Sequence, residues 1–151
     1  MSRLTIDPKP AALLACAASL LLSAHASLAH PSHHSAAARQ ANLAHVQDQN
    51  KALASGNAVQ AAYAFRGTRY VMGGTSRSGF DCSGFVRYIL GATNGVALPR
   101  TAIEQYYHGA RISDGQLQPG DLVFFATDTA DPATIHHVGL YVGGGNMVNA
   151  P

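Results

Sequence analysis

The sequence has little charge and only two cysteines, and neither sign of charge dominates. Charged residues make up 12% of the 151 positions, and the formal net charge is +2. Proteins that bind nucleic acid carry a concentrated basic face, and the sequence shows none, so no nucleic-acid partner is expected. Apolar residues make up 47% of the chain, which is enough for a compact core and argues against general disorder. The length allows one domain of ordinary size.

The sequence also lacks an apolar run that would span a membrane comfortably, since a span needs roughly 20 apolar residues. The apolar stretch at residues 11–23 follows a start that contains Arg3 and Lys9, and it precedes Ala24-His25-Ala26. A basic start, a short apolar core and a small-x-small cleavage site are the parts of an export signal. We therefore predict a signal peptide over residues 1–26, with Ala29 as the alternative cleavage point, and a mature protein in the periplasm or cell wall.

The first cysteine, Cys16, lies inside the predicted signal. Leu13-Leu14-Ala15-Cys16 resembles a bacterial lipoprotein processing box, but the apolar run continues beyond the cysteine through residues 20–22. Only about five apolar residues precede Cys16, which is short for a signal core, so cleavage without lipid attachment is favoured. Removal of the signal leaves Cys82 as the single cysteine. An unpaired thiol in an exported protein is unusual, which favours a chemical role for it.

Residues 27–55 are predicted to be a flexible or helical linker. Their first part is rich in Ala, Ser and His but has no ordered scaffold that would hold a metal, so no metal site is predicted there. The histidines of this part are His30, His33 and His34. Residues 39–54 contain good helix formers with a thin apolar stripe. That stripe is Leu43, Val46 and Leu53.

The folded domain is predicted over residues 56–151. Apolar periodicity and turn residues predict helices at 58–65, from 82 to between 91 and 95, and at 102–108, and strands at 122–126, 137–142 and 147–149. Helices followed by an antiparallel sheet form an α+β pattern.

Cys82 is predicted to lie at or just inside the N-terminus of a helix. Apolar residues at positions 85, 86, 89 and 90 have helical spacing, and the glycine-rich turn 73–79 precedes the cysteine. Helix dipoles and free N–H groups favour a thiolate at such a place, so Cys82 is a candidate nucleophile. The alternative is a buried structural cysteine.

His137 is the candidate base for this nucleophile. Val138, Leu140 and Val142 alternate toward one face of the predicted strand, which leaves His137 on the other face with Gly139 beside it. Asn149 on a neighbouring strand could hold the imidazole, in the manner of Cys-His-Asn sites. The alternative for Asn149 is an ordinary residue at the end of a strand.

Six blocks in order resemble the NlpC family of bacterial cell-wall peptidases. They are Tyr70-Val71-Met72-Gly73-Gly74, Phe80-Asp81-Cys82-Ser83-Gly84-Phe85, Leu98-Pro99-Arg100-Thr101, Pro119-Gly120-Asp121-Leu122-Val123-Phe124-Phe125, His137-Val138-Gly139-Leu140-Tyr141 and Val148-Asn149-Ala150-Pro151. The resemblance implies a papain-like α+β fold, with N-terminal helices packed on a small antiparallel sheet and the nucleophile at a helix N-terminus. It also implies hydrolysis of peptidoglycan stem peptides at the bond between γ-D-glutamate and a diamino acid, by a monomer without cofactor.

The resemblance assigns a role to each site residue. Cys82 would be the nucleophile and His137 the general base and acid, while Asn149 occupies a third polar position that is often His in the family. The resemblance places Tyr70, Asp81 and Ser83 along the substrate groove, where they would recognise the free amine of the stem peptide. For Asp81, a helix N-cap is a second and compatible role.

Family members usually continue for another strand after the position of Pro151, so the domain is expected to be either cut short or minimally closed. Two other functions stay open at this point, a non-catalytic wall-binding protein and a thiol amidase or acyltransferase on the same scaffold.

Overall fold

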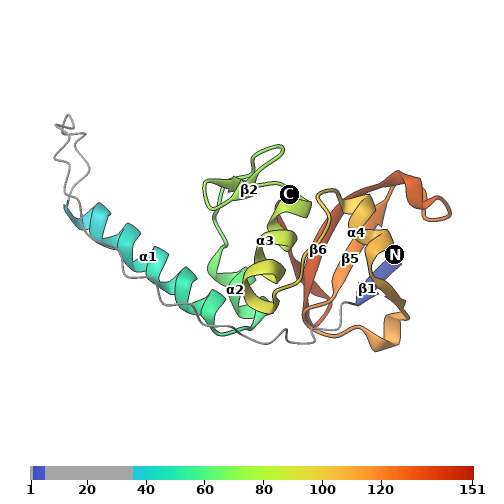
Figure 1. Ribbon diagram of the computed structural model, residues 1–151, viewed down its shortest axis with the longest axis horizontal. Coiled ribbons are helices and arrows are strands. Elements are labelled where there is room, and N and C mark those ends of the chain that lie inside the picture. Colours follow the sequence, from blue (N-terminus) through green and yellow to red (C-terminus); the bar gives the residue numbers. More distant parts are fainter. Residues whose placement is uncertain (1, 6–35) are drawn as a thin grey trace.

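The structure is a computed structural model that describes residues 2–5 and 36–151. Its helices are α1 (Ala36–Ala54), α2 (Ala58–Ala64), α3 (Cys82–Asn94) and α4 (Ala102–His108), with short 3₁₀ helices η1 (Asp114–Gln116) and η2 (Pro132–Thr134). Its strands are β1 (Ser2–Thr5), β2 (Thr75–Ser76), β3 (Gly79–Phe80), β4 (Ala110–Ile112), β5 (Leu122–Ala126), β6 (Ile135–Gly143) and β7 (Asn146–Val148). The helices precede most of the sheet in the chain, so the predicted α+β class is confirmed (Figure 1).

Within the described residues, the main sheet has the strand order β4-β1-β5-β6-β7, and each pair of neighbours is antiparallel. β2 and β3 form a separate hairpin. The helices α2, α3 and α4 all contact β6. Val138 and Leu140 of β6 are completely buried against these helices, as the alternation of the strand predicts.

Local signals explain where the helices begin and end. Asn57 caps α2 by accepting a hydrogen bond from the backbone of Gln60 at 3.0 Å. Thr101 and Glu104 form a reciprocal capping box at the start of α4. Gly95 ends α3 in the left-handed conformation, with φ of 68°, which costs glycine little.

The segment before Cys82 is anchored by aromatic packing. Phe80 is 1% exposed, and its ring contacts the rings of Phe65, Phe85 and Tyr88 at centroid distances of 6.0, 5.7 and 5.2 Å. Such edge-on pairs add to the free energy gained from burying the rings. The start of α3 therefore has a fixed position relative to the core.

The glycine-rich turn lies directly over the first turn of α3. The carbonyl of Gly74 accepts a hydrogen bond from the backbone of Asp81 at 3.0 Å. A Cβ on Gly84 would lie only 2.1 Å from that carbonyl oxygen, so the close approach requires glycine at this position.

The predicted helices and strands of the domain are confirmed with shifted ends. α2 ends at Ala64, with Phe65 as its C-cap. β6 begins at Ile135, two residues earlier than predicted, and β7 ends at Val148, so Asn149 follows the strand rather than lying in it. The strands β2, β3 and β4 were not predicted, because two or three residues are too few to show alternation.

Two features lie in the region before the domain. Residues 36–54, inside the predicted linker, form the single helix α1, which projects away from the rest of the fold (Figure 1). β1 lies inside the predicted signal peptide, and its backbone pairs with β4 on one side and β5 on the other. The rest of that segment, including Cys16, lies outside the described residues, as do His30, His33 and His34 of the linker. No helix in the described part is long and apolar enough to cross a membrane.

Candidate active site

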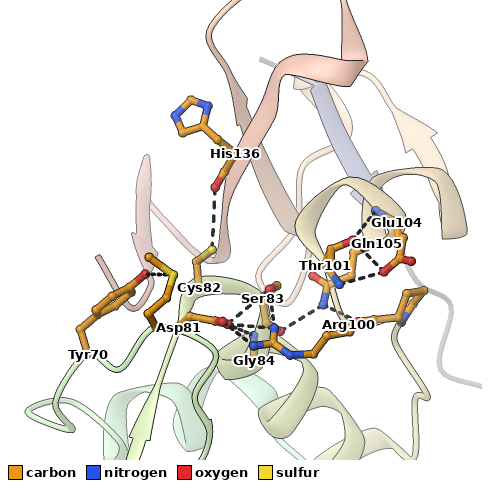
Figure 2. A network of polar contacts seen from close by, with 12 residues as sticks. Tyr70, Asp81, Cys82, Ser83, Gly84, Arg100, Thr101, Glu104, Gln105 and His136 are labelled. Atoms are coloured by element: carbon orange, nitrogen blue, oxygen red, sulfur yellow. Dashed lines mark hydrogen bonds and ion pairs between the residues drawn. The ribbon is translucent and has the colours of Figure 1, made fainter.

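Cys82 is the first residue of α3, and its thiol faces β6. Its Sγ lies 4.0 Å from the main-chain oxygen of His136, to which it can donate a weak hydrogen bond (Figure 2). Cys82 is a free thiol, half-buried at the edge of the core. The helix N-terminus thus brings the thiol against the main chain of the residue that directly precedes His137.

His137 is held on β6 by Asn149 and Phe125. The Asn149 amide nitrogen lies 3.0 Å from Nε2 of His137, and the Phe125 ring lies opposite on β5 at a centroid distance of 5.8 Å. Gly139 makes room for this contact, because a Cβ there would approach Cβ of Asn149 to 3.3 Å and Sδ of Met147 to 2.7 Å. The predicted pairing of the imidazole with Asn149 is therefore present in the structure.

The Asn149 contact leaves Nδ1 as the free ring nitrogen of His137. For Nδ1 to accept a proton, Nε2 must carry the hydrogen, and Asn149 must then present its amide oxygen to the ring. Rotation of the amide exchanges its oxygen and nitrogen at the same position. Asn149 can therefore hold the tautomer in which Nδ1 acts as a base.

Burial lowers the pKa of His137, and the neighbouring charge of His136 lowers it further. Both effects disfavour the imidazolium ion. The side chain of His136 itself is exposed and points away from Cys82, with its Nδ1 3.2 Å from the carbonyl of Thr134 (Figure 2). A neutral imidazole is the form that can take a proton from a thiol.

Asp81 and Ser83, on either side of Cys82, are both buried and both contact Arg100. Arg100 donates from Nη1 to Oδ1 of Asp81 at 3.1 Å and from Nη2 to Oδ2, and Nη1 also lies 3.0 Å from Oγ of Ser83 (Figure 2). Oδ1 of Asp81 also accepts from the backbone of Gly84 at 2.7 Å, so the predicted N-cap is confirmed. Oδ2 accepts only from Arg100 among the described residues.

These contacts control the ionisation of Asp81 and Arg100. Burial by itself would raise the pKa of Asp81, but the hydrogen bonds from Arg100 and Gly84 and the charge of Arg100 outweigh burial and lower that pKa. The hydrogen bond to Asp81 raises the pKa of Arg100 against the opposing effect of burial, and the charges of Asp81 and Cys82 raise it further. Both side chains are therefore charged at neutral pH.

Tyr70 lies on the other side of the nucleophile and is 43% exposed. Its backbone forms a parallel bridge with Phe80, which lies two residues before Cys82, and its hydroxyl lies 3.7 Å from Sδ of Met72. Met72 is 82% exposed, so this pair forms an open surface near the start of α3 (Figure 2). Such a surface is available to a bound molecule.

The structure places the predicted site residues around the start of α3 and on the neighbouring part of the sheet. The Cys82 thiol contacts the main chain of β6 at His136, His137 pairs with Asn149, and Asp81 and Ser83 point toward Arg100. Sequence reasoning missed Arg100 as a site residue. The signal was a basic residue in the Leu98-Pro99-Arg100-Thr101 block, together with a carboxylate, Asp81, beside the candidate nucleophile. No group of three or more His, Cys, Asp or Glu side chains in the described part could hold a metal ion.

Known proteins resemble the part of the chain that contains this site. The NlpC/P60 family model matches residues 67–151. Over 84 residues the chain is 49% identical to the "Probable endopeptidase p60" of Listeria innocua, which covers 56% of this chain and 17% of that protein. Over 93 residues it is 45% identical to the gamma-D-glutamyl-L-lysine dipeptidyl-peptidase of Bacillus subtilis, which covers 62% of this chain and 31% of that enzyme.

A solved structure agrees with these sequence similarities. The NlpC/p60 domain of the peptidoglycan hydrolase SagA matches with a TM-score of 0.55 at 36% identity, over 68% of this chain and 80% of that one. This chain spans less than a third of the length of the two relatives named above. The family match covers more than half of the chain and includes Cys82, His137 and Asn149. The chain belongs to the NlpC/P60 family.

Proposed function

We propose that the chain is an exported cysteine peptidase that hydrolyses peptidoglycan stem peptides. The observation that carries the proposal is the Cys82 thiol at the start of α3, which lies 4.0 Å from the main-chain oxygen of His136 on β6. The next residue of β6, His137, has its Nε2 3.0 Å from the amide of Asn149. The named activities of the relatives, an endopeptidase and a dipeptidyl-peptidase, support the reaction class. The relative that acts on a gamma-D-glutamyl-L-lysine bond supports the bond between γ-D-glutamate and a diamino acid as the one cleaved.

The geometry supports a two-step hydrolysis. Nδ1 of His137 takes the proton of the Cys82 thiol, and Sγ attacks the carbonyl carbon of the scissile amide. The first N–H groups of α3 have no carbonyl partners within the helix, so they can stabilise the oxyanion that forms. His137 then donates its proton to the leaving amine as the carbon–nitrogen bond breaks. Water, deprotonated by His137, hydrolyses the thioester and restores the thiol.

Substrate recognition is proposed for Tyr70, Asp81 and Ser83. The free amine of a stem peptide would approach Oδ2 of Asp81, which accepts a single hydrogen bond in the described structure and has capacity for another. The exposed Tyr70 ring would line the groove beside it. The carboxylate of Asp81 is already paired with Arg100, so the attraction for an ammonium group depends on how far that pairing neutralises it.

The test is digestion of purified peptidoglycan, followed by mass spectrometry of the soluble fragments. We expect new ends at the γ-D-glutamyl bond with the wild-type protein and none with Cys82→Ala. Paired stem peptides with free and acetylated amines would show whether the free amine is preferred. Binding to the wall without new fragments would support a non-catalytic wall protein. Fragments cut at another amide, or acyl transfer products, would support a different thiol enzyme.

A further inference from the structure

We propose that Arg100 is a positioning residue for the nucleophile: it holds both residues that flank Cys82 and thereby fixes the thiol at the start of α3. The proposal rests on the proposed role of Cys82 as the nucleophile. Arg100 comes from the segment before α4, 18 positions after Cys82 in the chain. It reaches the site from a different element than the nucleophile or the base (Figure 2).

The first observation is the geometry of the guanidinium group. Its two terminal nitrogens contact the two oxygens of Asp81, and one of them also contacts Oγ of Ser83 at 3.0 Å. A planar fork of this kind fixes the orientation of a carboxylate as well as its position. The carboxylate oriented by Arg100 caps α3 at Gly84, so the same contact also fixes the first turn of the helix.

A second tether comes from Gln105 of α4. This side chain is completely buried, and its Nε2 donates to the carbonyl of Ser83 at 3.0 Å and to the carbonyl of Pro99 at 2.9 Å. Its Oε1 has no partner among the described residues. Gln105 therefore joins the residue after the nucleophile to the segment that carries Arg100. In the described structure, the one hydrogen bond of the Cys82 thiol goes to β6 and not to this segment, so Arg100 acts through the two neighbours of Cys82.

Arg100 also affects the Cys82 thiol through its charge. Asp81 places a negative charge next to the thiol, which by itself would oppose a thiolate. Arg100 compensates that charge from within the same hydrogen-bonded group. Among the titratable and charged groups on the elements around the thiol, Asp81 and Arg100 lie at the start of α3, and His136 and His137 lie on β6. Farther along these elements, α3 carries Arg87 and Tyr88 and β6 carries Tyr141. Loss of Arg100 would leave the Asp81 carboxylate uncompensated beside the nucleophile.

Arg100→Gln tests this role, with Arg87→Gln as the matched control. Arg87 also joins α3 to the segment before α4, through a hydrogen bond from Nε to the carbonyl of Leu98 at 2.9 Å, but it has no contact with Asp81 or Ser83 in the described structure. Both substitutions remove one positive charge and one tether. Only Arg100→Gln alters the residues on either side of Cys82.

Four quantities are measured on the full chain. They are the melting temperature, kcat and KM on a defined stem peptide, and the pH dependence of iodoacetamide alkylation at Cys82, resolved by peptide mass spectrometry. For Arg100→Gln we expect alkylation of Cys82 to require higher pH than in the wild-type protein, because the uncompensated carboxylate of Asp81 opposes a thiolate. We expect kcat to fall roughly 10- to 100-fold. KM should change as well, because Arg100 pairs with the carboxylate that is proposed to bind the substrate amine, so the alkylation profile, which needs no substrate, is the deciding measurement. Arg87→Gln should keep the wild-type alkylation profile.

Arg100→Lys decides the question if Arg100→Gln does not fold. Lysine keeps the charge but cannot contact both oxygens of Asp81 and the hydroxyl of Ser83 together. We expect a smaller shift of the same sign and a partial loss of kcat. Wild-type alkylation and kcat in a folded Arg100→Gln or Arg100→Lys protein would overturn the proposal. Equal effects of Arg87→Gln and Arg100→Gln would overturn it as well. They would show that any link between α3 and the segment before α4 affects the thiol in the same way.

A double variant tests whether Arg100 acts through Asp81. Adding Asp81→Asn to Arg100→Gln removes the uncompensated carboxylate, so the alkylation profile should move part of the way back. Two changes that act through the same group are not additive. An additive upward shift would contradict the proposal. Alkylation needs no turnover, so this test can be read even if the wild-type protein proves inactive on stem peptides, an outcome that would contradict the proposed function instead.

Discussion

Cys82 and His137 are expected to act as a unit, because the thiol is a nucleophile only after the imidazole takes its proton. Cys82→Ala and His137→Ala should each abolish turnover, and the double variant should lose little more. The measurement is kcat/KM on a defined stem peptide, with circular dichroism as the control for folding. A double variant whose loss equals the product of the single losses would mean that the two residues act independently.

Asn149 should matter less than the base that it orients. It contacts Nε2 of His137 and not the reacting atoms, so Asn149→Ala should retain partial turnover. Asn149→His should be tolerated, because a histidine can also accept a hydrogen bond from Nε2. The same kinetic assay measures both variants. Complete loss in Asn149→Ala with normal folding would show that Asn149 does more than orient the ring.

His136 is expected to tune the base without taking part in the reaction. Burial lowers the pKa of His137 first, and the charge of His136 adds to it. His136→Ala removes the second cause, so the pKa of His137 should rise toward its ordinary value near 6.5. The base must be neutral, so the acid limb of kcat/KM should move to higher pH, with turnover above that limb preserved. A dead His136→Ala beside an active His137→Ala would reverse the assignment of the base.

The close packing of α3 against the glycine-rich turn depends on the absence of a side chain at Gly84. Gly84→Ala would place a methyl group 2.1 Å from the carbonyl oxygen of Gly74, so the turn or the helix must shift. We expect a loss of about 1–3 kcal/mol in the free energy of unfolding, as for other overpacked sites. Denaturant titration measures it.

Gly91→Ala is the control in the same helix. A Cβ at Gly91 would meet nothing closer than the Val96 carbonyl oxygen at 3.6 Å, an ordinary contact. This substitution should be neutral or stabilise the protein by about 0.5–1 kcal/mol, because alanine favours the helix. If both variants lost the same stability, the close approach to the turn would not be the cause.

The export prediction concerns the whole molecule. We expect the mature protein to begin at Ser27 or His30 without a lipid, because the apolar run continues past Cys16. N-terminal sequencing of the exported protein measures this, and Cys16→Ala should leave the cleavage unchanged. A modified Cys16 at the new N-terminus, or an uncleaved chain, would contradict the prediction.

Cleavage at that position would also remove β1 from the sheet. The backbone of residues 2–5 pairs with both β4 and β5, so its loss would leave unpaired groups along β5. Amide exchange over β5 should then be faster in the processed chain than in the full chain.

Much of the fold was predictable because its signals are local. Asn57, Asp81 and Thr101 each cap a helix through a contact three residues away, and Gly95 ends a helix through its own backbone freedom. The face of β6 that enters the core follows from side-chain alternation along one strand. These interactions depend on neighbours in the chain, so the sequence by itself determined the main helices and strands and placed Cys82 at a helix N-terminus.

The tertiary structure alone decided which side chains meet. The fork of Arg100 joins residues 19 positions apart, and the contact of Asn149 with His137 depends on the register between β6 and β7. Neither periodicity nor spacing encodes such contacts, because they depend on how separate elements pack against one another. The same reason applies to β4 and β1, short strands that exist only through their partners in the sheet. Interactions between chain neighbours thus determined the place of Cys82 at the start of α3 and of His137 on β6, and packing between elements decided the partners of Asp81 and His137.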